Sequence, residues 1–277
     1  MTIFEREGQT EKVWTKLVKV NDHWLRLLHR PHHQARAVWF VHGLGDWSDI
    51  WRPAFHHSAL AGWELYATDL PGFGWTLPLQ ADATVDHLAH WLQGVVSAIA
   101  GEKPVVLVGH SIGGAIATML AKERPGWLAG FVNVDGNLTE ADCSLISAPV
   151  AAAIDFEQWF EAFSERIYRE GVERRVLRRY HAGLLLSHRP TFLRANRSLV
   201  QLSQNGSLRQ VYSTLSLPRI HFHSTTEFSE ASRQFLAEQS LAYVAFEGVG
   251  HWIMREAEHD FYQRLGDWLS HLEQERQ

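Results

Sequence analysis

Two residues of this sequence, a serine and a histidine, stand in settings that suit nucleophilic catalysis. Residues 109–113 read GHSIG and directly follow the apolar run 104–108, so Ser111 is expected on a tight turn between a buried strand and a helix. The flanking glycines suit that turn, because a side chain at either position would clash with the neighbouring strand and helix. This geometry presents the hydroxyl of Ser111 at the edge of a sheet.

The hydroxyl needs a base, and histidine is the side chain whose pKa suits proton transfer near neutral pH. His251 lies late in the chain, in the segment 248–252 (GVGHW), after the last apolar run. We therefore predict Ser111 as the nucleophile and His251 as its base.

A tetrahedral oxyanion needs preorganised donors, and two backbone N–H groups can supply them. Residues 41–46 (VHGLGD) follow the apolar run 37–41, and Ile112 begins a helix. The N–H groups of Leu44 and Ile112 are therefore the predicted oxyanion hole.

The elements that must position these residues alternate along the chain. Strands are predicted at 13–20 and 23–30, joined by a short turn at the edge of a sheet. Short apolar runs without alternation are typical of strands buried on both faces, and helical spacing appears between them. The pattern predicts an α/β fold, a mostly parallel sheet with helices on both faces and ligands at the carboxyl ends of its strands. The buried strands are expected at 37–41, 64–68, 104–108, 130–134, 219–223 and 242–246, and the clearest helices at 84–100, 112–124 and 257–272.

The alternation stops between residues 138 and 213, where helical patterns dominate. We interpret this segment as a helical cap inserted into a core domain made of residues 1–137 and 214–277. Because large aromatic side chains often line pockets for apolar ligands, four of them are predicted to contact the substrate: Trp47, Trp159, Phe163 and Trp252.

Taken together, these motifs resemble the α/β-hydrolase superfamily. The resemblance rests on the HG loop at 42–43, the turn 69–74 (DLPGFG), the elbow 109–114 (GHSIGG) and the late GH at 250–251, in the family's order. It implies a third catalytic group, an acid that orients His251. Members that cleave carbon–halogen bonds or epoxides carry an aspartate at the elbow, so Ser111 implies acyl transfer to water instead. Asp69 and its turn are best explained as structural, since tight turns favour Pro and Gly.

The acid has two candidates. In most members it follows the strand after the cap, and the matching residue here is Glu227. Asp135, in 133–137 (NVDGN), resembles the arrangement in other members, including a branch of the haloalkane dehalogenases. We favour Asp135, because a carboxylate at the tip of a strand lies on the active edge of the sheet. Glu227 stays as the alternative, since it can simply precede a helix, where negative charge is favoured.

Composition narrows the partners. The formal net charge of −5 gives no sign of the basic surface that nucleic-acid binding requires. Cys143 is the only cysteine, which rules out an intrachain disulfide and a cysteine-based zinc site. Residues 1–7 do not read as a signal peptide, and no run is apolar enough for stable membrane insertion. We predict a cytoplasmic enzyme, a monomer or homodimer, that uses no metal or cofactor.

The predicted reaction is cleavage of an ester-like bond in a small, apolar or aromatic substrate through an acyl-enzyme. Three alternatives remain open. They are a carbon–carbon bond hydrolase acting on ring-cleavage products, a cofactor-free perhydrolase, and a small-molecule receptor with little turnover.

Overall fold

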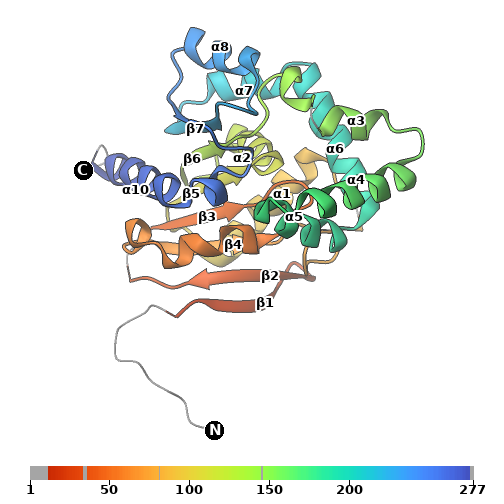
Figure 1. Cartoon of the computed structure of the whole chain (residues 1–277). Coiled ribbons are helices and arrows are strands. Elements are labelled where there is room, and N and C mark those ends of the chain that lie inside the picture. Colours follow the sequence, from red (N-terminus) through yellow and green to blue (C-terminus); the bar gives the residue numbers. More distant parts are fainter. Residues whose placement is uncertain (1–11, 34–35, 81, 145, 275–277) are drawn as a thin grey trace.

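The computed structural model describes residues 12–33, 36–80, 82–144 and 146–274, so the prediction made for residues 1–7 lies outside it. Its centre is an eight-stranded sheet in the order β1-β2-β4-β3-β5-β6-β7-β8 (Figure 1). The pairs β1–β2 and β2–β4 are antiparallel, and all later pairs are parallel. The predicted α/β class and mostly parallel sheet are confirmed. The strands are β1 (Trp14–Val20), β2 (His23–Arg30), β3 (Ala37–Val41), β4 (Glu64–Thr68), β5 (Val105–His110), β6 (Leu128–Val134), β7 (Arg219–Ser224) and β8 (Tyr243–Phe246).

Helices cover both faces of this sheet. Neighbouring residues of a strand point to opposite faces of the sheet. Phe131 of β6 therefore faces one helix layer, whereas Val132 of β6 and Phe222 of β7 face the other. Phe131 meets Tyr212 of α7 (Ser207–Thr214), whereas Phe222 meets Phe261 of α10 (Glu258–Gln274). The helices α1 (Val85–Ala100) and α2 (Ile112–Lys122) belong to the α7 side, and the 3₁₀ helices η1 (Ser48–His56) and η2 (Ser58–Leu60) to the α10 side.

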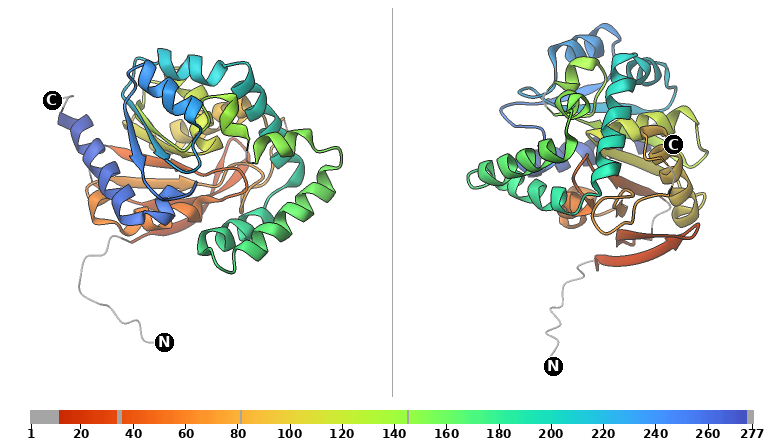
Figure 2. Two further views of the ribbon diagram at one scale, coloured as in Figure 1. Left: turned by 45° about the horizontal axis from the view of Figure 1, so that its top comes forward. Right: turned by 90° about the vertical axis from the view of Figure 1, so that its right-hand side faces the viewer.

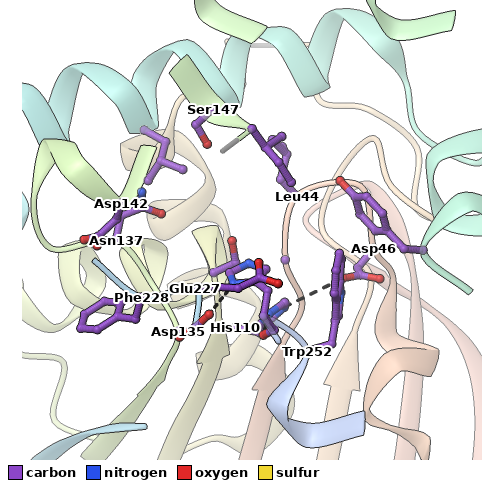
Figure 3. Close-up of a pocket in the computed structure, with 16 residues that line it drawn as sticks. Leu44, Asp46, His110, Asp135, Asn137, Asp142, Ser147, Glu227, Phe228 and Trp252 are labelled. Atoms are coloured by element: carbon purple, nitrogen blue, oxygen red, sulfur yellow. Dashed lines mark hydrogen bonds and ion pairs between the residues drawn. The ribbon is translucent and has the colours of Figure 1, made fainter. Parts of the chain in front are cut away.

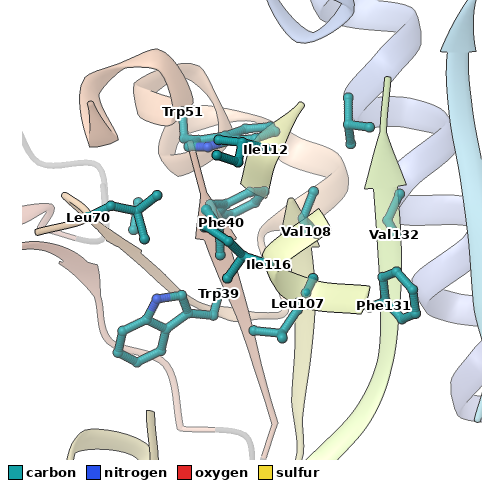
Figure 4. Packing of buried hydrophobic residues seen from close by; sticks show 14 of the residues in the cluster. Trp39, Phe40, Trp51, Leu70, Leu107, Val108, Ile112, Ile116, Phe131 and Val132 are labelled. Atoms are coloured by element: carbon teal, nitrogen blue, oxygen red, sulfur yellow. The ribbon is translucent and has the colours of Figure 1, made fainter. Parts of the chain in front are cut away.

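The core between these layers is apolar and closely packed (Figure 4). Trp39 and Phe40 of β3 are fully buried and point to opposite faces, where Trp39 stacks on Tyr66 and Phe40 meets Trp51 of η1. Each buried aromatic side chain removes a large apolar area from water, so burial of this kind is the main force holding the helices to the sheet.

Helices also fill the long insertion between β6 and β7. They are η3 (Glu140–Cys143), α3 (Ser147–Ala152), α4 (Phe156–Glu170), α5 (Arg175–Leu185), α6 (Arg189–Gln204) and α7. The helices α4 and α5 pack together and extend from one end of the sheet (Figure 2), while α7 packs against α2 of the core layer. The predicted division at residues 138–213 remains a prediction. After β7 the chain adds α8 (Glu230–Glu238) and, before α10, the short α9 (Ile253–Glu256). Among the described residues no helix combines the length and the apolarity that crossing a bilayer demands.

Asp69 is a structural carboxylate, as predicted from its turn. It is fully buried, and it accepts hydrogen bonds from the backbone N–H groups of Ser48 at 2.7 Å and Trp75 at 2.8 Å. Its Oδ1 also lies 3.4 Å from the guanidinium of Arg26, which is itself buried. These contacts tie the turn after β4 to β2 and to the start of η1.

We expect Asp69→Ala to lower the free energy of unfolding by about 3 kcal/mol, because buried donors and part of a buried ion pair lose their partner. Urea unfolding followed by circular dichroism measures this loss. The exposed Asp267→Ala of α10 is the matched control and should change it by less than about 0.5 kcal/mol. Equal effects of the two substitutions would contradict the structural role of Asp69.

Candidate active site

Ser111 lies on a strained turn between β5 and α2. Its backbone has φ 53° and ψ −122°, in the left-handed region that non-glycine residues rarely adopt. The turn is possible because the residues two positions away on each side, Gly109 and Gly113, have no side chains: a Cβ on Gly109 would lie 2.3 Å from the carbonyl oxygen of Gly113. Tight packing of strand against helix therefore requires glycine here, and it holds Ser111 at the carboxyl end of β5.

His251 and Asp135 form a hydrogen-bonded pair beside this turn. The Nδ1 of His251 lies 2.5 Å from Oδ2 of Asp135. The other carboxylate oxygen of Asp135 accepts a hydrogen bond from the backbone N–H of Ser224 at 2.9 Å, and the residue is 5% exposed. Asp135 directly follows β6 and has a φ of 50°, so the end of that strand aims its carboxylate at the histidine loop.

The surroundings of His251 favour its charged form. Burial alone lowers the pKa of the imidazole, but the hydrogen bond to Asp135 and the charges of Asp135 and Glu227 outweigh it and raise that pKa above its usual value. The ring also packs against His110 with a centroid distance of 4.6 Å. Neighbouring carboxylates thus make the imidazole of His251 more basic than it would otherwise be.

Glu227, the alternative acid, lies in the same cavity but acts on His251 through charge, without a hydrogen bond to its ring. It precedes Ser229, the residue that caps α8, and its backbone N–H donates to the hydroxyl of Ser224 at 3.2 Å. The geometry therefore favours Asp135 as the partner of His251.

Of the two residues predicted for the oxyanion hole, Leu44 lies in a loop beside Ser111 and Ile112 directly follows Ser111 in the chain. Leu44 lines the cavity, and a Cβ on the preceding Gly43 would lie 3.3 Å from Cβ of Ser111, so this loop rests against the elbow. Ile112 is the first residue of α2, where backbone N–H groups have no partner within the helix. Its side chain is buried in the core (Figure 4), which leaves its backbone for any role in the cavity.

A cavity of about 740 Å³, its open mouth included, lies over the carboxyl ends of the strands (Figure 3). Ser111, His251, Asp135, Glu227 and Leu44 all line it. The inserted helical segment closes it from the other side with Ile146, Ser147, Tyr180 and Leu199. The carboxyl ends of β3, β5 and β6 and the segments after β7 and β8 thus meet in one place, as expected for a parallel sheet.

Only one of the four predicted substrate-contacting aromatic residues lines this cavity, namely Trp252. The other three are not among its lining residues, so their contact with the substrate remains a prediction. Trp159 stacks on Phe163. Phe163 is buried, and the centroid of its ring lies 6.2 Å from that of Tyr180, which does line the cavity. The ring of Trp47 packs so closely against Gly183 of α5 that a Cβ on this glycine would lie 2.9 Å from it. Of these three residues, Phe163 joins α4 to α5 through Tyr180, and Trp47 meets α5 at Gly183.

Sequence reasoning missed two cavity residues that stand beside its own motifs, Asp46 and His110. Both are at most 2% exposed. The signal was available, since each belongs to a segment chosen for its neighbour: Asp46 ends VHGLGD and His110 precedes Ser111. The cavity therefore holds these two buried polar side chains beside the apolar ones that line it. The described residues contain no group of three or more His, Cys, Asp or Glu side chains placed to hold a metal ion.

Comparisons with known proteins agree with this geometry. A family model described as "alpha/beta hydrolase fold" matches residues 36–226. The chain is 40% identical over 108 residues to "Lipase LipV" of Mycobacterium tuberculosis, a match that covers 38% of each protein. It is 26% identical over 126 residues to "Pimeloyl-[acyl-carrier protein] methyl ester esterase" of Shewanella woodyi, covering 46% of this chain and 41% of that protein. The matches thus span less than half the length of these curated relatives.

Solved structures show the same architecture over a larger share of the chain. A carboxylesterase structure from Nitrososphaera gargenis superposes with a TM-score of 0.74 at 18% identity, covering 94% of this chain and 100% of that one. At this identity the likeness concerns the fold.

Proposed function

Because this chain belongs to the α/β-hydrolase fold family, we propose that it is a serine hydrolase that cleaves an ester-like bond with Ser111, His251 and Asp135. The observation that carries this proposal is the convergence of a serine on a strained strand-to-helix turn and a histidine 2.5 Å from a buried carboxylate in one cavity. Activities in the names of relatives, a lipase and a methyl ester esterase, are consistent with it.

In the proposed mechanism, neutral His251 takes the proton of Ser111 as its oxygen attacks the substrate carbonyl. The imidazolium that forms is stabilised by Asp135. The backbone N–H groups of Leu44 and Ile112 stabilise the oxyanion. His251 then gives the proton to the leaving alcohol, and water releases the acyl group from Ser111 by the same steps in reverse order.

The charge of the cavity points to the substrate class. The carboxylates of Asp135, Asp142 and Glu227 line the cavity, and none of its described lining residues is a lysine or arginine. A carboxylate on the substrate would find no cationic partner there and would be repelled. We therefore propose a neutral ester, lactone or related acyl compound as substrate. Dienolic ring-cleavage products carry a carboxylate, so this observation disfavours carbon–carbon bond hydrolysis.

A pair of matched esters tests the proposal. We expect p-nitrophenyl butyrate to be hydrolysed with a kcat/KM at least about tenfold above that of p-nitrophenyl hemisuccinate, whose acyl chain is similar in length but ends in a carboxylate. A tenfold ratio corresponds to about 1.4 kcal/mol of transition-state stabilisation. Hydrolysis of neither ester, or a preference for the anionic one, would contradict the proposed substrate class.

A further inference from the structure

Buried polar groups connect the three loops that carry Leu44, Ser111 and His251 (Figure 3). The Nε2 of His110 lies 3.0 Å from the backbone carbonyl oxygen of His251. The indole N–H of Trp252 donates to Oδ2 of Asp46 at 3.0 Å. The same Oδ2 lies 3.9 Å from Nδ1 of His110. Each of these residues is next to, or two positions from, a residue of the proposed catalytic site.

The positions of two protons in this group follow from the partners. A carbonyl oxygen can only accept, so Nε2 of His110 carries a hydrogen. Burial and the charge of His251 hold the pKa of His110 well below its usual value, so its ring is neutral and its Nδ1 is a bare acceptor. That Nδ1 is buried, and in the part of the chain that the structure describes it has no hydrogen-bond partner.

An ionised Asp46 would leave two buried acceptors facing each other. Asp46 is 2% exposed, and the described residues that line its cavity include no lysine or arginine. A carboxylate and the lone pair of Nδ1 repel each other, and among the described residues Nδ1 has no donor. A carboxylic acid removes the conflict, because one oxygen can accept from Trp252 and donate its proton towards His110. The gap of 3.9 Å must shorten by about 1 Å for a direct hydrogen bond, so the proposal requires Asp46 and His110 to approach each other by that amount.

We propose that Asp46 is a positioning residue that works as a neutral carboxylic acid, closing a ring of hydrogen bonds with His110 and Trp252. The ring runs from Asp46 to Nδ1 of His110, from Nε2 of His110 to the carbonyl of His251, and from the indole of Trp252 back to Asp46. It fixes the loop of Leu44, the elbow of Ser111 and the histidine loop relative to one another. This inference rests on the proposed function for its kinetic consequences.

The electrostatics around Asp46 agree with a neutral acid. Burial raises the pKa of its carboxyl group to about 7, although the hydrogen bond from Trp252 and the charge of His251 act in the opposite direction. The titratable groups that face it are His110, His251 and Tyr180, and burial raises the pKa of the Tyr180 hydroxyl well above its usual value. Neutrality has a catalytic benefit, since a negative charge two residues after Leu44 would oppose the oxyanion.

Two substitutions separate the hydrogen bonds of Asp46 from its charge. In Asp46→Asn the amide oxygen can accept from Trp252 and the NH₂ group can donate to His110, so the ring persists at every pH. We expect it to keep kcat for p-nitrophenyl butyrate within a few-fold of wild type at about pH 6 and to abolish the fall in kcat that the wild type shows as pH rises past about 7. Asp46→Leu has a similar size but no polar atoms. It should lower kcat about 10- to 100-fold at all pH values with little change in KM.

Glu227→Gln is the matched control for charge, because Glu227 lines the same cavity and also raises the pKa of His251 but is not part of the ring. Its kcat should fall at alkaline pH as the wild type does. Kinetic loss in Asp46→Asn as large as in Asp46→Leu would mean that the negative charge of Asp46 is needed and would overturn the proposal. So would an alkaline decline that is unchanged in Asp46→Asn.

A stability measurement tests the same assignment without turnover. A carboxyl group with a raised pKa keeps its proton in the folded state where the unfolded chain has lost it, so its contribution to stability declines as pH rises from about 4 to about 7. Asp46→Asn lacks this term. The difference in free energy of unfolding, Asp46→Asn minus wild type, should therefore increase from about pH 4 to about pH 7 and stay constant above that. A constant difference would contradict a neutral Asp46, and it would do so even if Ser111 proved not to be the nucleophile.

Discussion

Replacement of Ser111 by alanine is expected to abolish ester hydrolysis almost completely, with a fall in kcat of at least about 10⁴-fold for p-nitrophenyl butyrate. The reason is that water must then attack the carbonyl without the oxygen of Ser111 and without an acyl-enzyme. The folded state should persist, because Ser111→Ala removes one oxygen from a cavity wall and leaves the backbone of the elbow unchanged. Steady-state kinetics and thermal unfolding measure the two effects.

The matched control is Ser270→Ala, which removes an exposed hydroxyl from α10 on the other side of the sheet from α2. Its kcat should equal that of wild type. If Ser111→Ala retained more than about 1% of the wild-type kcat after a contaminating esterase had been excluded, another residue would have to be the nucleophile.

The second large effect concerns the acid. Asp135→Asn should lower kcat about 10²- to 10⁴-fold, because the amide cannot stabilise the imidazolium of His251 and can favour the wrong tautomer. It also removes the hydrogen bond and charge that raise the pKa of His251, so that pKa falls. Because the base acts in its neutral form, the rise of kcat/KM with pH should then move to lower pH. The pH dependence of the residual activity measures this shift.

Glu227→Gln is the comparison that makes this prediction specific. Glu227 affects His251 through charge alone, so the substitution should cost far less than Asp135→Asn and move the pH profile by less. Losses that are mild and equal in the two variants would show that the acid has been chosen wrongly or that each carboxylate can replace the other.

Most of the fold follows from patterns of apolar residues. All eight predicted strands are present within one or two residues of their expected bounds. Runs such as 37–41 could be identified because a strand buried on both faces must be apolar throughout, and the helix at 84–100 because its apolar side chains repeat with helical spacing. The start of α1 has a local cause as well, since the hydroxyl of Thr84 accepts from the backbone N–H of His87.

The site was only partly predictable. Ser111 and His251 could be found because their chemistry demands glycine neighbours and a place after a strand, which are local properties of the sequence. The roles of Trp47, Trp159 and Phe163 depend on how α4 and α5 pack, and a sequence pattern does not show which side of an aromatic helix face is taken up by another helix. Two polar residues of the cavity, Asp46 and His110, were missed for a similar reason, since their contacts arise only on folding. Asp46 is significant only because folding brings it to Trp252, 206 positions away in the chain.

The most direct test of the central claim is covalent labelling of the intact protein with a fluorophosphonate, followed by peptide mass spectrometry. A serine made nucleophilic by a neighbouring base displaces fluoride and retains the phosphonate, which stands in for the tetrahedral intermediate. We predict one phosphonate per chain on the peptide that contains Ser111, no label in Ser111→Ala, and slow labelling in Asp135→Asn. A label on any other residue, or an unlabelled protein that still hydrolyses the neutral ester, would contradict the account.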